Sequence, residues 1–260
     1  MTTTALITGA SGGIGYELAK LFAHDHHNLV LVARSASKLT QFAGELQNQF
    51  GVSVKTVPLD LSTVPAPKFL FDQLQREGVA VDILVNNAAY GKHGEFAEMP
   101  MEETLGQIQL NITALTYLTR LFLPPMVERR NGKILNVAST AGFQAGPLMA
   151  VYYATKAYVI SFSEALANEV KGTGVTVTCL CPGATDTGFQ KRAETENSVL
   201  FKKLRPMDAK TVALDGYRAL MSGKTLAISG LRNWLLAESL RFAPRKLVIA
   251  ISRKMLDQVP

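Results

Sequence analysis

The chain has 260 residues, of which 47% are hydrophobic and 18% are charged, a composition that excludes long disordered segments. Its length fits one α/β domain with a sizeable core, and no apolar stretch approaches the roughly 18 to 20 residues of a membrane-spanning helix. Residues 1–190 carry 13 basic and 15 acidic side chains, whereas residues 191–260 carry 14 and 6, so the positive charge lies in the last quarter. This favours an anionic cofactor, an anionic substrate or a membrane surface. Nucleic acid is disfavoured because no aromatic–basic pattern accompanies the charge.

Short apolar runs alternate with helical periods along the chain. The runs rich in Val, Ile and Leu predict seven strands at Ala5–Thr8, Leu29–Ala33, Val52–Pro58, Ile83–Asn86, Lys133–Ala138, Val175–Cys181 and Thr225–Ser229. The segments between them predict helices at Gly13–Asp25, Ser37–Gln49, Pro67–Glu77, Met101–Glu128, Val151–Gly172 and Asp208–Met221. Strands that are apolar on both faces are typical of a parallel sheet covered by helices, so we expect a doubly wound α/β fold. No linker divides the chain, which predicts a single domain over residues 1–260.

The pattern changes after the last predicted strand. Asn233–Phe242 and Pro244–Asp257 predict two short amphipathic helices, with Pro244 at a first helical position, so residues 230–260 form a helical extension. We favour a role in covering a substrate cleft or contacting another subunit, and leave peripheral membrane contact as the alternative. No signal segment precedes the first predicted strand, which indicates a cytoplasmic protein.

The stretch from Thr8 to Gly15 permits two interpretations. Gly9-Ala10-Ser11-Gly12-Gly13 fits the G-x-S-x-G turn that exposes a nucleophilic serine. That chemistry needs a later histidine as base, and the last histidine of the chain is His93. The same glycines, between a strand and a helix, allow backbone N–H groups and a helix N-terminus to approach a pyrophosphate. We therefore predict a dinucleotide-binding loop.

The end of the second predicted strand indicates which dinucleotide binds. An acidic residue there would bind the ribose 2′-hydroxyl, whereas an arginine accommodates a 2′-phosphate. This chain has Arg34, with Lys38 one helical turn further on. The pattern favours NADP(H) over NAD(H).

Tyr152 and Lys156 lie four residues apart, and therefore on one face of a predicted helix. A tyrosine of pKa about 10 is a poor acid–base catalyst at neutral pH, and a nearby cation lowers its pKa. Ser139 follows the strand Lys133–Ala138, where its hydroxyl is placed to hydrogen-bond a substrate carbonyl. Asn111 lies inside the predicted helix Met101–Glu128.

Three other features have simpler interpretations. Cys179 and Cys181 share one face of a strand, so we expect buried free thiols rather than a disulfide or a zinc site. The run from His24 to His27 falls at a helix end, where polar side chains face water, and predicts no metal site. Tyr153 points about 100° away from Tyr152 on the helix and is predicted to pack.

With these motifs in order, the sequence resembles the short-chain dehydrogenase/reductase family, in its short single-domain subclass, from about Thr4 to Ser229. The motifs are Thr8-Gly9-x-x-x-Gly13-x-Gly15, Asp60-Leu61, Asn86-Asn87-Ala88-Ala89 with Ala89 in place of glycine, the tetrad Asn111, Ser139, Tyr152 and Lys156, and Pro182-Gly183-x-x-x-Thr187. Leu121–Pro124 and Pro182–Phe189 further resemble a bacterial branch of general oxidoreductases. The resemblance implies a Rossmann-type fold and a homodimer or homotetramer joined through the helices at Met101–Glu128 and Val151–Gly172.

The resemblance also implies the roles of the residues. Tyr152 would exchange a proton with the substrate oxygen while the nicotinamide exchanges a hydride with its carbon. Lys156 would lower the pKa of Tyr152 and bind the nicotinamide ribose, Ser139 would polarise the carbonyl, and Asn111 would position a relay water. Cofactor contacts are implied for Gly9, Ser11, Gly13, Ile14, Gly15, Arg34, Lys38, Asp60, Leu61, Asn87, Ala88, Tyr152, Lys156, Pro182, Gly183, Thr185 and Thr187.

The leading hypothesis is an NADP(H)-dependent carbonyl reductase or alcohol dehydrogenase. A non-catalytic NADP(H)-binding sensor or scaffold, and a peripheral lipid-binding protein, remain as alternatives. The substrate pocket is predicted from Ala141–Met149, Phe189–Arg205 and the C-terminal helices. Its apolar residues favour a lipid-like carbonyl or alcohol: Phe143, Leu148, Met149, Phe189, Val199, Leu200 and Phe201. Four basic residues leave an anionic, carrier-linked substrate open: Lys191, Arg192, Lys202 and Lys203.

Overall fold

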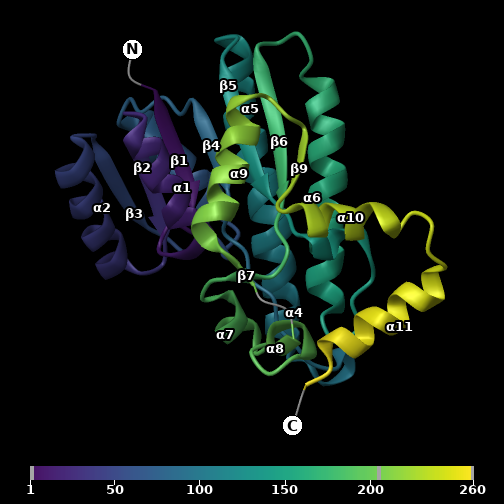
Figure 1. Ribbon diagram of the computed structural model, residues 1–260. Helices are drawn as coiled ribbons and strands as arrows, with labels where there is room; N and C mark the ends of the chain where they lie inside the picture. The colour runs from purple at the N-terminus through teal and green to yellow at the C-terminus, as the bar shows by residue number, and fades with distance from the viewer. Residues whose placement is uncertain (1–2, 204–205, 259–260) are drawn as a thin grey trace.

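The protein is described by a computed structural model over residues 3–203 and 206–258 (Figure 1). Its centre is a seven-stranded parallel sheet in the order β3-β2-β1-β4-β5-β6-β9. The strands are β1 (Thr4–Thr8), β2 (Asn28–Ala33), β3 (Val54–Pro58), β4 (Ile83–Asn86), β5 (Gly132–Val137), β6 (Val175–Cys181) and β9 (Leu226–Ile228). This confirms the predicted Rossmann-type doubly wound sheet. The strand order reverses between β1 and β4, and ligands bind such folds at that point, beyond the carboxyl ends of the strands.

Helices cover both faces of the sheet because each strand is apolar on both sides. Ala5 and Ile7 of β1 pack in one core with α1 (Gly13–His24), α2 (Ala36–Phe50) and α9 (Ala209–Met221). Leu6, which points the opposite way, packs in a second core with α3 (Ala66–Arg76), α5 (Leu115–Glu128) and α6 (Ala150–Glu169). The alternation along one strand therefore places a core on each face.

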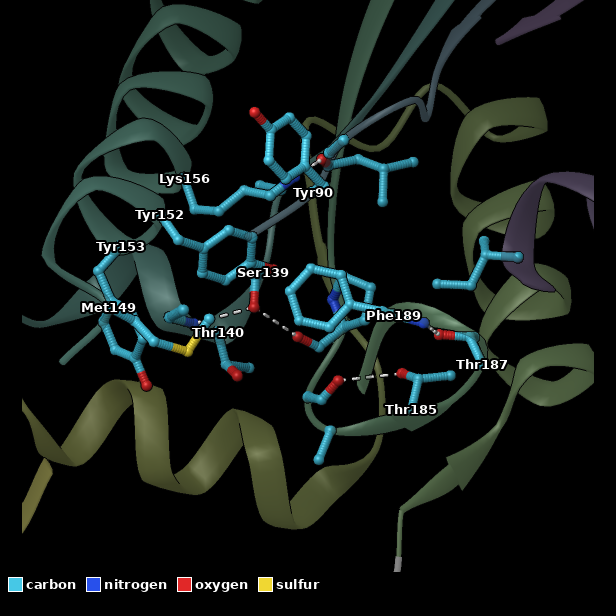
Figure 2. Close-up of a pocket in the computed structure, with 18 of the residues that line it drawn as sticks. Tyr90, Ser139, Thr140, Met149, Tyr152, Tyr153, Lys156, Thr185, Thr187 and Phe189 are labelled. Atoms are coloured by element: carbon cyan, nitrogen blue, oxygen red, sulfur yellow. Dashed lines mark hydrogen bonds between the residues drawn. The ribbon is translucent and has the colours of Figure 1, made fainter. Parts of the chain in front are cut away.

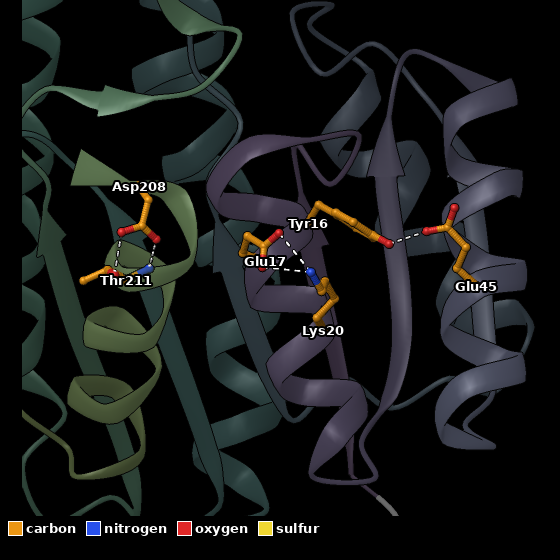
Figure 3. A network of polar contacts seen from close by, with 6 residues as sticks. All are labelled: Tyr16, Glu17, Lys20, Glu45, Asp208 and Thr211. Carbon is orange, nitrogen blue, oxygen red and sulfur yellow. Dashed lines mark hydrogen bonds and ion pairs between the residues drawn. The ribbon is translucent and has the colours of Figure 1, made fainter. Parts of the chain in front are cut away.

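Side-chain contacts join α1 to α2 and cap the start of α9 (Figure 3). The Tyr16 hydroxyl on α1 donates a hydrogen bond to Glu45 on α2, and Lys20 pairs with Glu17 at 3.1 Å. Asp208 caps α9 by accepting from the Thr211 backbone N–H at 2.8 Å. Such a cap satisfies one of the N–H groups that a helix start leaves unpaired.

The segment predicted as one helix, Met101–Glu128, has a wider turn in its middle. The structure has α4 (Met101–Ile108), a π-helical turn (Gln109–Ala114) and then α5. Asn111 lies in that turn and is buried, with its amide bonded to the backbone of Tyr90 on a neighbouring loop. The prediction of an uninterrupted α-helix was wrong because this tertiary hydrogen bonding has no local sequence pattern.

Several short elements between β6 and the C-terminus were not predicted. They are β7 (Thr185–Asp186), α7 (Phe189–Ala193), α8 (Val199–Lys203) and β8 (Met207–Asp208), with β7 and β8 pairing as a small parallel sheet. The other missed turns are the 3-10 segments Phe96–Glu98 and Thr140–Phe143.

The C-terminal helices α10 (Leu231–Ser239) and α11 (Arg245–Leu256) form an arm beside α6 (Figure 1). Both were predicted, although Pro244 is the N-cap of α11 rather than its first residue. The arm returns to the body of the protein through Leu256, which is buried against Ala193 and Tyr153. Among the described residues, no helix is long and apolar enough to cross a membrane.

Candidate active site

A cavity of about 1390 Å³ lies at the carboxyl ends of the strands and is also lined by residues of α10 and α11. Figure 2 shows part of its lining. One end is lined by the glycine turn after β1 and the residues that follow β2. The other end is lined by Ser139, Tyr152 and the apolar residues of the arm. The cavity therefore joins the predicted cofactor site to the predicted substrate site.

The turn between β1 and α1 presents backbone rather than side chains to this cavity. Gly9 and Gly13 have φ angles of 66° and 53°, values that favour glycine, and both line the cavity. The first turn of α1 has no acidic residue, and no side chain caps its start. A helix N-terminus with free N–H groups suits an anion, so these residues fit the pyrophosphate of a dinucleotide.

Ser139, Tyr152 and Lys156 converge on the cavity from two adjacent elements. Ser139 follows β5 and donates a hydrogen bond to the carbonyl oxygen of Pro182 at 3.3 Å. Tyr152 and Lys156 lie on α6, with the Lys156 Nζ 5.7 Å from the centre of the Tyr152 ring. Figure 2 shows the Tyr152 ring beside Ser139, with the ring of Phe189 next to it.

Burial dominates the electrostatics of this group. It raises the pKa of Tyr152 well above its usual value, and a side-chain hydrogen bond with Ser139 opposes that rise. Burial lowers the pKa of Lys156 to about 8, and its Nζ donates to the Val137 carbonyl at 2.7 Å. Burial sets the direction of the Tyr152 pKa shift in the protein by itself, so the expectation that Lys156 lowers this pKa stays a prediction.

Asn111 lies one layer behind these side chains. Its Oδ1 accepts from the Tyr90 N–H at 3.1 Å, and its Nδ2 donates to the Tyr90 carbonyl at 2.8 Å. The same Nδ2 donates to the Thr155 hydroxyl at 3.1 Å, next to Lys156 on α6. Asn111 thus connects the loop after β4 to the helix that carries Tyr152 and Lys156.

Cations gather at the opposite end of the cavity. Arg34 and Lys38 line it, both exposed, together with Asp60 and Leu61. Asp60 accepts hydrogen bonds from the Ser62 backbone and hydroxyl, which help to hold its pKa below the usual range despite partial burial. This arrangement suits an adenosine with a phosphate on its ribose.

Most of the predicted cofactor residues line the cavity, but Gly15 does not. A Cβ at Gly15 would lie 2.4 Å from the Gly9 carbonyl oxygen and 2.5 Å from the Asn87 Nδ2. Gly15 therefore allows α1 to pack closely on the turn instead of lining the pyrophosphate path. Those that line the cavity are Gly9, Ser11, Gly13, Ile14, Arg34, Lys38, Asp60, Leu61, Asn87, Ala88, Tyr152, Lys156, Pro182, Gly183, Thr185 and Thr187.

Two residues of the site had no predicted role: Thr8, which begins the glycine motif, and Tyr90. The Thr8 hydroxyl donates to the Val85 carbonyl and accepts the backbone N–H groups of Asn87 and Ala88, each at about 3 Å, which ties the first turn to the loop after β4. Tyr90 follows Asn86–Ala89 directly and lines the cavity. Its position after a recognised motif was the one available signal.

Part of the predicted substrate pocket lines the cavity. Met149, Phe189, Leu200 and Phe201 line the cavity, whereas Phe143, Leu148 and Val199 are not among the lining residues. The arm adds apolar residues that complete the lining: Leu231, Leu236, Leu240, Leu247, Val248, Ile251, Met255 and Leu256. Lys202 is exposed on α8, and the side chain of Lys203 and residue Arg205 lie outside the described residues.

The remaining polar clusters have structural roles. Cys179 and Cys181 are buried free thiols on β6, with Sγ atoms 3.8 Å apart, as expected. No group of three His, Cys, Asp or Glu side chains within 3–203 and 206–258 is arranged to hold a metal ion. Asp25 instead accepts a hydrogen bond from the Tyr217 hydroxyl. Tyr153 is buried and packs against Met149, in agreement with its predicted packing role.

Comparisons with known proteins agree with this geometry. A family model described as short chain dehydrogenase matches residues 3–198. The ketoacyl reductase HetN of Nostoc is 36% identical over 187 residues, covering 72% of the chain and 65% of that protein. The mouse very-long-chain 3-oxoacyl-CoA reductase is 34% identical, covering 72% of the chain and 61% of that protein. The chain thus spans less than two thirds of the length of these relatives.

Two solved structures share the fold over nearly the whole chain. The short-chain dehydrogenase from Sphingobium yanoikuyae in complex with NADPH is 32% identical with a TM-score of 0.83, covering 92% of the chain and 94% of that protein. A family member from Burkholderia phymatum in complex with NAD has a TM-score of 0.82 at 24% identity, covering 100% and 98%. The second likeness supports the fold alone.

Proposed function

Because the chain belongs to the short-chain dehydrogenase family, we propose that it is an NADP(H)-dependent oxidoreductase acting on an apolar, lipid-like carbonyl or secondary alcohol. The convergence of Ser139, Tyr152 and Lys156 on the cavity that also contains the glycine turn carries this proposal. An intact tetrad argues against a non-catalytic sensor or scaffold. We propose that residues 1–260 form a single domain, with residues 230–260 completing its substrate site.

Each side chain of the site has a separate role in the reduction of a carbonyl. When bound, NADPH supplies the hydride for the carbonyl carbon. Tyr152 is protonated at neutral pH, as a tyrosine of ordinary pKa already is, and it donates that proton to the carbonyl oxygen. Ser139 orients the carbonyl by a hydrogen bond, and Lys156 places a positive charge beside the forming alkoxide. Asn111 acts at a distance, through Tyr90 and Thr155 or through a relay water.

The cofactor contacts follow from the lining of the cavity. Gly9, Ser11, Gly13 and Ile14 would hold the pyrophosphate at the start of α1, and Asp60 with Leu61 would contact the adenine. Arg34 and Lys38 would bind the 2′-phosphate, which supports NADP(H) over NAD(H). The residues that would contact the nicotinamide half are Asn87, Ala88, Tyr152, Lys156, Pro182, Gly183, Thr185 and Thr187.

The lipid-like substrate is supported by the arm. Leu236, Leu240 and Leu247 line the cavity between α10 and α11, at the end that contains Tyr152. Burial of an acyl chain there would contribute about 0.8 kcal/mol for each CH₂ group. The names of the relatives, reductases of ketoacyl and 3-oxoacyl groups, are consistent with such a substrate.

The test is NADPH oxidation against a panel of ketones and 3-oxoacyl thioesters. Tyr152→Phe should lower kcat by at least about 100-fold, since it removes the proton donor. Tyr158→Phe is the matched control, because Tyr158 is on the same helix but exposed and bonded to Thr116. Activity that survives Tyr152→Phe would refute the mechanism.

A second candidate function, contact with a membrane surface, is favoured by the outer side of the arm. Trp234 and Phe242 are exposed and do not line the cavity, with 46% and 88% of their surface accessible. Arg245 and Lys246 are exposed nearby at the start of α11. Aromatic and basic side chains together suit the interface of an anionic bilayer. Such contact is compatible with catalysis on a lipid-like substrate.

We also propose that the protein assembles as a homodimer or homotetramer. Met101 and Leu105 on α4 are exposed, and α4 belongs to one of the two helices expected to join subunits. Light scattering after size-exclusion chromatography tests this. A monomer at micromolar concentration would contradict it.

A further inference from the structure

The short helix α7 spans the cavity from the catalytic tyrosine to the cationic end. Its first residue, Phe189, places its ring 5.1 Å from the ring of Tyr152. Three residues on, the guanidinium carbon of Arg192 lies 4.2 Å from the centre of the Tyr90 ring. Both residues line the cavity. One five-residue helix therefore contacts both ends of the site.

Arg192 is held in this position by its surroundings. The ring of Tyr90 is buried, and its backbone is fixed by both hydrogen bonds to Asn111. The next residue, Ala193, is fully buried, and its carbonyl accepts the His93 backbone N–H at 2.9 Å. A guanidinium stacked on an aromatic face keeps its N–H donors free at its edge. The stack therefore presents those donors to the cavity.

The charges around Arg192 favour the binding of an anion. Partial burial and then the charge of Arg34 lower the pKa of Arg192, so the two guanidinium groups act on each other electrostatically. Among residues 3–203 and 206–258, no ion pair is formed by Arg34, Lys38 or Arg192. The carboxylate of Asp60 lies within electrostatic range of both arginines, but its recorded hydrogen bonds are to Ser62. The carboxylate of Glu103 also acts on Arg192, so three cations face two carboxylates and the site keeps a net positive charge.

We propose that Arg192 is a specificity-determining residue that binds the cofactor's 2′-phosphate from the substrate side of the cavity, opposite Arg34. This inference rests on the proposed NADP(H) preference and adds a residue that no motif identifies. Two arginines facing one phosphate form charge-assisted hydrogen bonds from both sides. Because Phe189 is on the same helix, phosphate binding also fixes α7 against Tyr152.

The test is equilibrium binding by calorimetry, with NADPH, NADH and adenosine 2′,5′-bisphosphate as probes. Arg192→Gln should weaken NADPH and the bisphosphate by about 10- to 100-fold and NADH by less than about 3-fold, as expected for losing a charge-assisted hydrogen bond to phosphate. Arg192→Lys keeps the charge but loses the planar fork. Its affinity for NADPH should therefore lie between those of the wild type and Arg192→Gln. Lys191→Gln is the control, because Lys191 is exposed on the same helix and does not line the cavity. Circular dichroism without ligand checks folding.

Two results would overturn the inference: equal weakening of NADPH and NADH, which would place Arg192 on the pyrophosphate, or unchanged affinity for all three probes. Arg34→Gln separates these failures from failure of the proposed function. If Arg34→Gln lowers the NADPH to NADH affinity ratio and Arg192→Gln does not, only the role of Arg192 is wrong. If neither variant changes that ratio, the NADP(H) preference is also wrong.

Discussion

Replacing Gly15 by alanine should destabilise the protein and weaken the binding of its cofactor, although glycine-to-alanine changes inside helices usually stabilise. The new Cβ would lie 2.4 Å from the Gly9 carbonyl oxygen, about 1 Å short of ordinary van der Waals contact. Its other close neighbour, the Asn87 Nδ2, cannot easily move, because it donates to Thr8 and Gly9 at 2.9 and 3.2 Å. The Gly9 turn must therefore shift.

The size of this effect follows from opposing contributions. Overpacking costs about 1–3 kcal/mol, and a strained or broken Asn87 hydrogen bond adds about 1 kcal/mol. The higher helix propensity of alanine offsets about 1 kcal/mol of this cost. We expect Gly15→Ala to lower the free energy of unfolding by about 2 kcal/mol and the affinity for NADPH by at least about tenfold, since the displaced turn is the proposed site of the pyrophosphate.

Gly44→Ala provides the matched control. Gly44 is inside α2, and a Cβ there meets nothing within 4 Å. This change should raise the free energy of unfolding by about 0.5–1 kcal/mol and leave NADPH affinity unchanged. Urea unfolding at one fixed protein concentration measures both variants. If Gly15→Ala is as stable as Gly44→Ala, the close packing of α1 on the turn does not have the proposed importance.

Three further predictions address charge and surface. The kcat/KM for carbonyl reduction should fall as pH rises through about 8, because Lys156 loses its charge there. Lys156→Arg should move that decline to higher pH. A pH profile that is flat through this range would contradict the role of Lys156. Arg34→Asp should shift the cofactor preference about 100-fold from NADPH towards NADH, because it replaces attraction with repulsion at the 2′-phosphate. Steady-state kinetics with both cofactors measures this preference. An unchanged preference would contradict the role of Arg34 in binding the 2′-phosphate. The double variant Trp234→Ser, Phe242→Ser should lose sedimentation with anionic liposomes while keeping activity on a water-soluble ketone; binding equal to wild type would exclude the arm as a membrane contact.

The parts of the fold that the sequence predicted are those with a repeating local signal. Strands such as Ile83–Asn86 and Val175–Cys181 are apolar on both faces, and the helices between them repeat every 3.6 residues. The proximity of Ser139 and Tyr152 could be predicted from the sequence, because a residue after β5 and a residue on α6 lie at the same end of the sheet. Differences in helix bounds reflect only where the terminal hydrogen bonds form.

The region between residues 184 and 208 was not predictable in the same way. Its elements have two to five residues, too few for a period to emerge, and they depend on distant partners. Arg192 stacks on Tyr90, about a hundred positions earlier, and the carbonyl of Ala193 meets His93. The wide turn at Asn111 arises similarly, from a buried amide that bonds to another loop. A motif identifies Asn111 and none identifies Arg192, but in both cases tertiary contacts decide where the side chain lies.

The electrostatics of Tyr152 bear on the direction of the reaction. A tyrosine tuned to a low pKa would serve as a base in alcohol oxidation, whereas burial here raises its pKa and Lys156 bonds to the Val137 carbonyl. The neutral phenol is then the dominant form at neutral pH, which is the form that donates a proton to a carbonyl oxygen. Alcohol oxidation must first remove that proton, so its rate should rise as the pH rises towards the pKa of Tyr152. The buried tyrosine thus supports the proposed direction of the reaction, carbonyl reduction at neutral pH.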